Sequence, residues 1–382
     1  MKIGIVGYSP LINQSAARSW SKIIYYLART LLRRGHEVII SPAFDAVKLH
    51  GVYVRIDKYE SLVASPRDLG RLGCEIALFV AGSHLFAPYE CSRRRRALDA
   101  FEKVFSEVKA SGVRRIVAYT SLDLYENVPH LTLEYLAKRF DYLIFFNEED
   151  AKIFAKSVEK HPKYSVVTPG VDTSLYSPAS KRCEEPTLLY VGRNSIEKDP
   201  ARLLAVLALL RKHSVAAKLV MLTNVCGLAP YGIFDLAAAA ASLGVAGDVI
   251  FVEEYIDEEK MPEVYRSARV FITLSGSEGV CLPILEAQAC GVPVVAQELP
   301  SLKSVYGDSY LSVSREGTYY LPHGSMPLAS VANAAAKVKA LLEDECMWEE
   351  YSKKGLENAR RYDWDKAVGP RFEKALEEAL SS

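Results

Sequence analysis

The sequence has no long uninterrupted apolar run, no excess of charge of either sign and no patterned set of cysteines. Without a run of roughly 20 apolar residues, no segment is predicted to span a membrane. Lysine plus arginine (47) equals aspartate plus glutamate (47), whereas nucleic-acid-binding proteins normally carry a basic excess, so we expect no nucleic-acid partner. The seven cysteines include no C-x-x-C pair, which argues against a disulfide framework or a zinc site and indicates reduced thiols in the cytoplasm.

The 382 residues, of which 49% are apolar, suffice for two or three domains with hydrophobic cores. Residues 2–6 form an apolar run that ends at Gly7, as in a strand followed by a turn and not as in a signal peptide. Helical periodicity then extends from Trp20 to Leu32. Further strands are predicted at 38–40, 76–81, 115–119 and 142–146, with a helix at about 93–110. This alternation indicates βαβ units and a parallel sheet.

A stretch rich in proline and glycine at residues 168–186 interrupts the alternation and is typical of a linker. The alternation then restarts, with segments at 187–191, 201–212, 218–222, 234–243, 249–252, 270–274, 283–289 and 292–296. The tail is predicted to contain helices at about 331–343 and 366–380 and no strand. The predicted fold class is therefore α/β, with two Rossmann-like, doubly wound parallel-sheet domains. Ligands of such sheets lie beyond the carboxyl ends of the strands, so we expect the domains to face each other across a cleft.

The strongest candidate site is the segment 275–287. A predicted strand ends there in small residues and one carboxylate, Glu278, and a helix begins near Pro283. The amides of Gly279, Val280, Cys281 and Leu282 would face outward at the positive end of that helix, which suits a phosphate or an oxygen-rich sugar. Glu286 could reach the same ligand, because helical side chains lean towards the N-terminus. The alternative is that Glu286 only complements the helix N-terminus and that Glu278 is a solvated loop residue.

A second candidate segment begins where another buried strand ends at Gly192. The loop that follows carries two positive charges, Arg193 and Lys198, and enters a helix. The planar fork of an arginine and the point charge of a lysine together suit a diphosphate. The alternative is a solvated loop in which Lys198 pairs locally with Glu197 or Asp199.

Together the two segments resemble the signature of retaining GT-B glycosyltransferases of the family 4-like type, which include bacterial glycogen synthases and phosphatidylinositol mannosyltransferases. The spacing from Glu278 to Glu286 matches the E-x7-E motif of these enzymes, and Gly192, Arg193 and Lys198 match their G-R-x(n)-K element. The likeness covers most of the chain and continues in Leu27-Ala28, Gly35-His36-Glu37-Val38, Pro169-Gly170-Val171-Asp172, Tyr265-Arg266-Ser267-Ala268, residues 289–296 and Tyr362-Asp363-Trp364.

The resemblance implies a GT-B fold. Residues 1–175 would form an acceptor-side domain, residues 176–362 a domain that binds the nucleotide sugar, and residues 363–382 a helix that crosses back to the first domain. In that family Arg193 and Lys198 would hold the donor diphosphate, Glu286 the ribose and Glu278 the donor sugar. The backbone amides from Gly279 to Leu282 would add donor contacts, and residues 223–227, Tyr255 and Ile256 would border the base.

The implied reaction is the transfer of a hexosyl group from a UDP-, GDP- or ADP-linked sugar, with retention of configuration and without a metal or another cofactor. Glu278, Arg193 and Lys198 would be the catalytic groups. The acceptor would be a hydroxyl of a lipid, a glycan or a small metabolite, and the sequence leaves these three open. A nucleotide-sugar epimerase or phosphorylase on the same fold, and a catalytically silent nucleotide-sugar-binding protein, are the alternatives.

The acceptor side departs from the family pattern. Arg18 and Ser19 stand where members usually carry a Gly-Gly pair, and residues 119–123 stand where many members have a histidine at the end of a strand. Asp123 or His84 could replace that histidine, and ordinary loop roles for both are the alternative.

The sequence contains three weaker patterns. Asp363 and Asp365 match the D-x-D of metal-dependent glycosyltransferases, but capping of the following helix explains them more simply. Arg93, Arg94, Arg95 and Arg96 could contact an anionic membrane surface peripherally, with a solvated helical face as the alternative. Gly4 and Gly7 resemble part of a dinucleotide-binding motif. The third glycine and the acidic residue of that motif are missing from this sequence, which argues against a nicotinamide cofactor.

Overall fold

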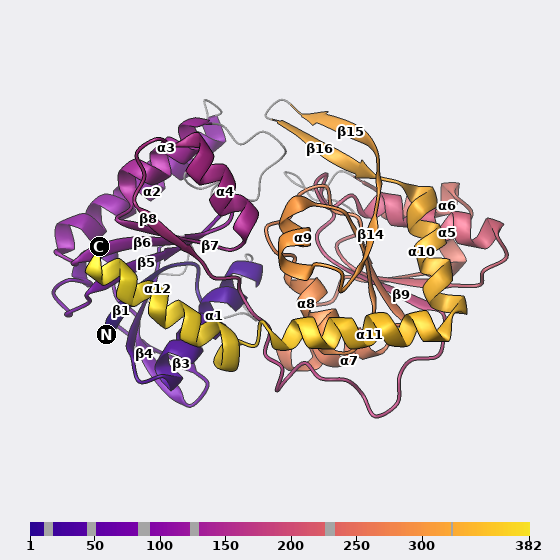
Figure 1. Cartoon of the computed structure of the whole chain (residues 1–382), viewed down its shortest axis with the longest axis horizontal. Helices are drawn as coiled ribbons and strands as arrows, with labels where there is room; N and C mark the ends of the chain where they lie inside the picture. Colours follow the sequence, from indigo (N-terminus) through magenta and orange to yellow (C-terminus); the bar gives the residue numbers. More distant parts are fainter. Residues whose placement is uncertain (11–17, 44–50, 83–91, 123–129, 226–233, 322–323) are drawn as a thin grey trace. The chain divides into compact units, whose positions relative to one another are not determined.

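A computed structural model describes residues 1–10, 18–43, 51–82, 92–122, 130–225, 234–321 and 324–382 (Figure 1). These residues form two compact units. The first unit consists of the described residues up to 172 together with residues 362–382, and the second consists of the described residues within 173–361. In this part of the chain, no helix is both long enough and apolar enough to cross a membrane.

The first unit is built around a six-stranded parallel sheet with the spatial order β2-β1-β5-β6-β7-β8. Its strands are β1 (Lys2–Gly7), β2 (Glu37–Pro42), β5 (Ile76–Val80), β6 (Arg115–Thr120), β7 (Tyr142–Phe145) and β8 (Lys163–Val166). Its helices are α1 (Arg18–Arg33), α2 (Ser92–Ser111), α3 (His130–Arg139), α4 (Glu148–Ser157) and α12 (Gly369–Ser381). Strands β5 and β7 are buried throughout, which is why they are continuous apolar runs in the sequence. A short antiparallel hairpin of β3 (Tyr53–Ile56) and β4 (Tyr59–Leu62) was not predicted.

The second unit contains another six-stranded parallel sheet, in the order β11-β10-β9-β12-β13-β14. Its strands are β9 (Thr187–Val191), β10 (Lys218–Leu222), β11 (Val249–Val252), β12 (Val270–Thr273), β13 (Val294–Gln297) and β14 (Leu311–Val313). Its helices are α5 (Pro200–Lys212), α6 (Leu236–Ser242), α7 (Met261–Arg266), α8 (Leu282–Ala289), α9 (Pro300–Tyr306), α10 (Val331–Glu343) and α11 (Glu345–Arg360). The α/β prediction with two parallel sheets is therefore confirmed.

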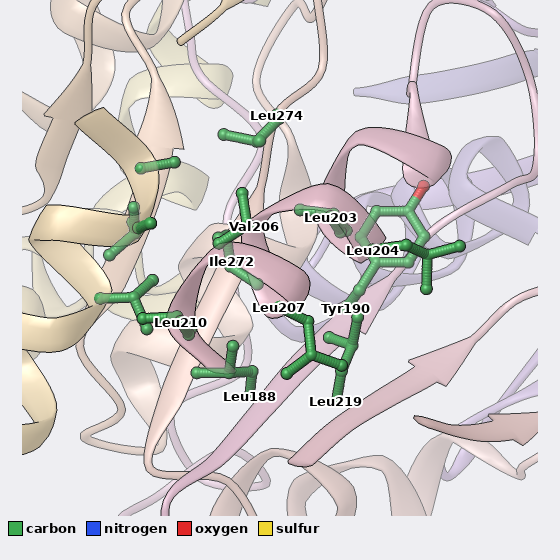
Figure 2. Close-up of a cluster of buried hydrophobic side chains, with 14 of the residues drawn as sticks. Leu188, Tyr190, Leu203, Leu204, Val206, Leu207, Leu210, Leu219, Ile272 and Leu274 are labelled. Atoms are coloured by element: carbon green, nitrogen blue, oxygen red, sulfur yellow. The ribbon is translucent and has the colours of Figure 1, made fainter. Parts of the chain in front are cut away.

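Helix α5 shows how the core of the second unit holds its sheet in place. The helix begins at Pro200, ends with two basic residues and buries leucines at helical spacing, among them Leu203, Leu207 and Leu210. Figure 2 shows these leucines clustered with Leu188 of β9 and Ile272 of β12. Each such side chain stabilises the fold by roughly 1.5–3 kcal/mol when fully buried. The core therefore fixes β9 and β12 firmly, and with them the loops that follow these strands.

The prediction for the tail is wrong in two respects. Strand β14 lies beyond residue 296, and after it comes an antiparallel hairpin of β15 (Arg315–Leu321) and β16 (Gly324–Ala329). Helix α11 was also missed, although Asp344 caps it by accepting a hydrogen bond from the Met347 amide. Three residues of β14 are too few for a periodicity signal, and the hairpin alternates less clearly than a half-buried strand should.

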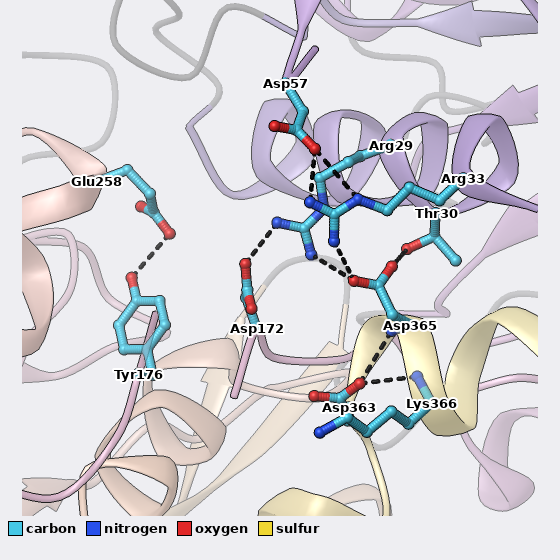
Figure 3. Close-up of polar contacts among 10 residues, drawn as sticks. All are labelled: Arg29, Thr30, Arg33, Asp57, Asp172, Tyr176, Glu258, Asp363, Asp365 and Lys366. Carbon is cyan, nitrogen blue, oxygen red and sulfur yellow. Dashed lines mark hydrogen bonds and ion pairs between the residues drawn. The ribbon is translucent and has the colours of Figure 1, made fainter. Parts of the chain in front are cut away.

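Asp363 and Asp365 have structural partners in the first unit (Figure 3). Asp363 accepts hydrogen bonds from the amides of Asp365 and Lys366 and so caps the short π-helix Trp364–Val368. Asp365 accepts hydrogen bonds from Thr30 and Arg33 of α1. Asp363 therefore caps the helix that follows it, as the capping interpretation predicts, and Asp365 attaches the C-terminal segment to α1.

Arg29 of α1 makes the most buried ion pair of this network, with Asp172 at 2.5 Å. The exposed fractions of the two side chains are 7% and 8%. We expect Arg29→Ala to lower the free energy of unfolding by about 3–5 kcal/mol, because a buried carboxylate loses its counter-charge. Urea unfolding followed by circular dichroism measures this loss. Arg33→Ala is the matched control, because the Arg33 side chain is 36% exposed and a pair at the surface contributes about 1 kcal/mol or less. Equal losses in the two variants would contradict the prediction.

Candidate active site

The strand order of the second sheet places the candidate residues together at the carboxyl ends of its strands. Strand β9 lies between β10 and β12, and the chain builds the sheet outward in one direction from β9 to β11 and in the other from β12 to β14. All strands are parallel, so the loops that follow β9, β10, β11 and β12 share the carboxyl edge. Open α/β sheets bind ligands at this edge, where the strand order reverses. In this sheet the reversal lies between β9 and β12, the two strands whose loops the sequence singled out.

The two loops meet through an ion pair. The Lys198 ammonium lies 2.7 Å from a Glu278 carboxylate oxygen, and the exposed fractions of the two side chains are only 19% and 9%. A backbone hydrogen bond from Gly276 to the carbonyl of Glu197 also joins the loops, at 2.8 Å. Burial by itself lowers the pKa of Lys198, but the charge of Glu278 opposes it and the net pKa is raised, so the ammonium stays protonated. Lys198 therefore pairs with Glu278, and not with Glu197 or Asp199 as the alternative interpretation had it.

Helix α8 begins next to this ion pair. Cys281 precedes the helix with a backbone φ of 58°, in the left-handed region, and Pro283 occupies the first turn. The Cys281 thiol also lies close to Glu278, and burial raises its pKa well above the ordinary value, so it is a neutral neighbour of the pair. The positive end of α8 therefore starts beside a largely buried lysine, which makes this region suitable for an anion.

Glu286 is held at a different place in the same helix. It is buried and accepts a 2.6 Å hydrogen bond from the hydroxyl of Tyr265 on α7. Burial and the nearby charge of Glu286 raise the pKa of Tyr265 well above its ordinary value, so its hydroxyl keeps the proton that it donates. Tyr265 was not predicted as a partner of Glu286, because the two residues lie 21 positions apart and the sequence does not indicate which group a tyrosine hydroxyl contacts.

Of the charged groups predicted for the donor site, Arg193 is the most exposed. Its side chain is 62% exposed and bonds Glu197 at 2.9 Å. Its carbonyl accepts a hydrogen bond from the hydroxyl of Tyr190, which lies beneath the turn. A Cβ atom added to Gly192 would lie 2.5 Å from that hydroxyl, so glycine is required there. The turn is therefore fixed, while the arginine head faces solvent.

The remaining predicted residues are spread over both units. Thr223 directly follows β10 and is buried, and Tyr255 and Ile256 follow β11 at the same edge as the ion pair. In the first unit, Ser19 is exposed on α1. His84, Asp123 and the side chains of Arg93–Arg96 lie outside the described residues, so the acceptor-side and membrane predictions stay predictions. Within the described part of the chain, His, Cys, Asp and Glu side chains form no group of three or more that could hold a metal ion.

The second unit matches the model of a known family. Residues 176–361 match the model of the family described as "Glycosyl transferases group 1". D-inositol 3-phosphate glycosyltransferase 2 of Catenulispora acidiphila is 29% identical over 238 residues, which cover 59% of this chain and 53% of that protein. The chain thus spans about half the length of the curated relatives that it matches.

Solved structures show the same fold over the whole chain. Sucrose-phosphate synthase from Thermosynechococcus elongatus matches with a TM-score of 0.75 at 14% identity and covers 100% of both chains. The Anabaena protein HepE, solved in complex with UDP and glucose, matches with a TM-score of 0.68 at 13% identity and covers 99% of this chain and 100% of its own. At these identities the likeness establishes the fold alone, and that fold is GT-B.

Proposed function

Because residues 176–361 match the model of the group 1 glycosyl transferases and the fold is GT-B, we propose that the protein transfers a hexosyl group from a nucleoside diphosphate sugar to an acceptor hydroxyl. Retention of configuration and independence of metal ions are part of this proposal. The observation that carries it is the largely buried Lys198–Glu278 pair where the strand order reverses. Taking two charges out of water is costly, which favours a role for them in binding a charged, hydroxyl-rich ligand.

In this proposal the diphosphate of the donor binds between Lys198, Arg193 and the first amides of α8. Arg193 supports the role because its exposed head is able to swing onto a ligand. Glu278 accepts hydrogen bonds from hydroxyls of the sugar, and Glu286 accepts them from the ribose. The base lies against the residues that follow β10 and β11.

The chemical step follows from these assignments. The bond between the anomeric carbon and the diphosphate oxygen breaks, and a new bond forms from that carbon to the acceptor oxygen. The acceptor proton passes to the departing diphosphate, which leaves on the same face of the sugar. Lys198, Arg193 and the amides of α8 stabilise the negative charge that grows on the diphosphate, and no metal is needed for this.

The test has two stages. Thermal unfolding is measured with UDP-, GDP- and ADP-linked hexoses, because a ligand that binds the native state raises its apparent stability. Release of the nucleoside diphosphate is then followed with a panel of acceptors, which includes inositol 3-phosphate because curated relatives are named for it. We expect release that depends on the acceptor and that persists in the presence of a chelator.

The alternatives give other results in the same assays. A nucleotide-sugar epimerase would interconvert the donor without release that depends on an acceptor. A silent binding protein would be stabilised by a nucleotide sugar and release nothing. Absence of stabilisation by every donor would contradict the proposal, and loss of activity with a chelator would contradict its metal-independent part.

A further inference from the structure

Helix α9 carries two hydroxyl groups that bond to the loop before α8. Ser301 donates a 2.6 Å hydrogen bond to the carbonyl of Glu278. Tyr306 donates to the carbonyl of Val280 at 2.7 Å and to that of Cys281 at 3.1 Å. Tyr306 is only 2% exposed, so its hydroxyl is directed at the loop from within the protein. Neither residue belongs to the motifs that pointed to this loop.

These bonds determine where the loop amides point. In a planar trans peptide, the carbonyl of one residue and the N–H of the next point in opposite directions. Because the carbonyls of Glu278, Val280 and Cys281 face α9, the N–H groups of Gly279, Cys281 and Leu282 point away from α9. These three amides are among those that the proposed function assigns to the donor diphosphate.

The loop needs such support because it is strained. A residue other than glycine with a φ of 58° is uncommon, and this conformation costs on the order of 1 kcal/mol. Cys281 adopts it, and Tyr306 bonds the carbonyl of this same residue. Without the tyrosine hydroxyl, the Val280 carbonyl loses the partner that turns it towards α9, and the Cys281 carbonyl keeps only its 2.9 Å bond from the Ile284 amide.

We propose that Ser301 and Tyr306 are positioning residues of the donor site: they hold the carbonyls of the loop on one side so that its amides face the diphosphate on the other. This inference rests on the proposed function and deepens it. The hydroxyls act through the backbone, so we expect them to affect diphosphate recognition and to leave recognition of the nucleoside unchanged.

The chain offers a matched control for each residue. The Tyr310 ring lies 6.1 Å from the Tyr306 ring, and its buried hydroxyl makes no hydrogen bond within the described residues, so Tyr310→Phe removes a hydroxyl that holds nothing. Ser304 lies on the same helix as Ser301 and donates only to the Ser301 carbonyl, so Ser304→Ala is the control for Ser301→Ala.

The experiment compares two affinities in each variant by titration calorimetry. One is for UDP, GDP or ADP, whichever binds the wild type best, and the other is for the corresponding nucleoside. We expect Tyr306→Phe to weaken diphosphate binding about 10- to 50-fold and Ser301→Ala about 3- to 10-fold, from the lost hydrogen bonds, while nucleoside binding changes less than about twofold. The two control variants should bind both ligands like the wild type.

Several results would overturn the inference. Unchanged diphosphate affinity in both Tyr306→Phe and Ser301→Ala would do so, and so would equal weakening of diphosphate and nucleoside, which indicates general damage. A loss of the same size in Tyr310→Phe would assign the effect to packing. A wild-type protein that binds none of the three nucleoside diphosphates contradicts the proposed function itself, which separates the two failures.

Discussion

Replacing Lys198 with alanine is expected to lower kcat/KM about 30- to 1,000-fold, which corresponds to about 2–4 kcal/mol of lost transition-state stabilisation. The ammonium is largely buried beside the start of α8, where an electrostatic interaction is stronger than in water. A second effect is expected on stability, because Glu278 loses the partner of its buried carboxylate. We expect this to cost about 1–3 kcal/mol, measured by urea unfolding.

Two comparisons separate these effects. Arg193→Ala should cause a similar loss of kcat/KM but change the free energy of unfolding by less than about 0.5 kcal/mol, because the Arg193 side chain is largely exposed. Lys303→Ala is the control, because Lys303 lies in the same unit and its ammonium pairs with Asp308 at the surface. This variant should change neither kcat/KM nor the free energy of unfolding. Near-normal turnover in both Lys198→Ala and Arg193→Ala would contradict the roles assigned to them.

The pH dependence of the ion pair follows from the raised pKa of Lys198. A group whose pKa is higher in the folded state stabilises the fold fully below its unfolded pKa, which is near 10.5 for lysine, and the stabilisation is lost as the pH rises through the folded pKa. The difference in unfolding free energy between the wild type and Lys198→Ala should therefore stay constant as Lys198 remains charged between about pH 6 and 9. It should shrink only in strongly alkaline solution.

The parts of the fold that could be predicted are those in which one physical signal dominates. Strands β9 and β12 are buried on both faces, so they are short apolar runs, and each leads into a loop of small or charged residues at the sheet edge. The start of α8 was visible because Pro283 suits a first helical turn. The loops that carry Lys198 and Glu278 could thus be assigned to one edge of one sheet from the sequence.

The contacts within the site could not be predicted in the same way. Lys198 and Glu278 were expected to converge on a ligand. Because they lie far apart in the sequence, nothing in it indicated that their side chains bond each other. Tyr190, Tyr265 and Tyr306 are buried, but only Tyr190 lies in an apolar run, and in none of the three cases does the sequence indicate which group the hydroxyl contacts. The partners of these hydroxyls depend on how the helices and strands pack. The three hydroxyls bond the Arg193 carbonyl, the Glu286 carboxylate and the Val280 carbonyl, respectively.

Glu278→Gln is expected to lower kcat about 100-fold while changing the KM for the donor by less than about threefold. The amide keeps the shape of the side chain but removes the charge that pairs with Lys198 and that, in our proposal, accepts hydrogen bonds from the donor sugar. Glu286→Gln should do the reverse and raise the donor KM about tenfold with little change in kcat. In our proposal Glu286 binds the ribose, which is equally bound before and during the reaction.

Initial rates measured over a range of donor concentrations distinguish these outcomes, with Glu349→Gln on the exposed face of α11 as the control. A double variant, Lys198→Met with Glu278→Gln, tests whether the pair acts as one unit. If it does, the double variant should lose little more activity than the worse single variant, because removing either partner already leaves the other without its counter-charge. Fully additive losses would show that the lysine and the glutamate serve the reaction independently and that their contact is incidental.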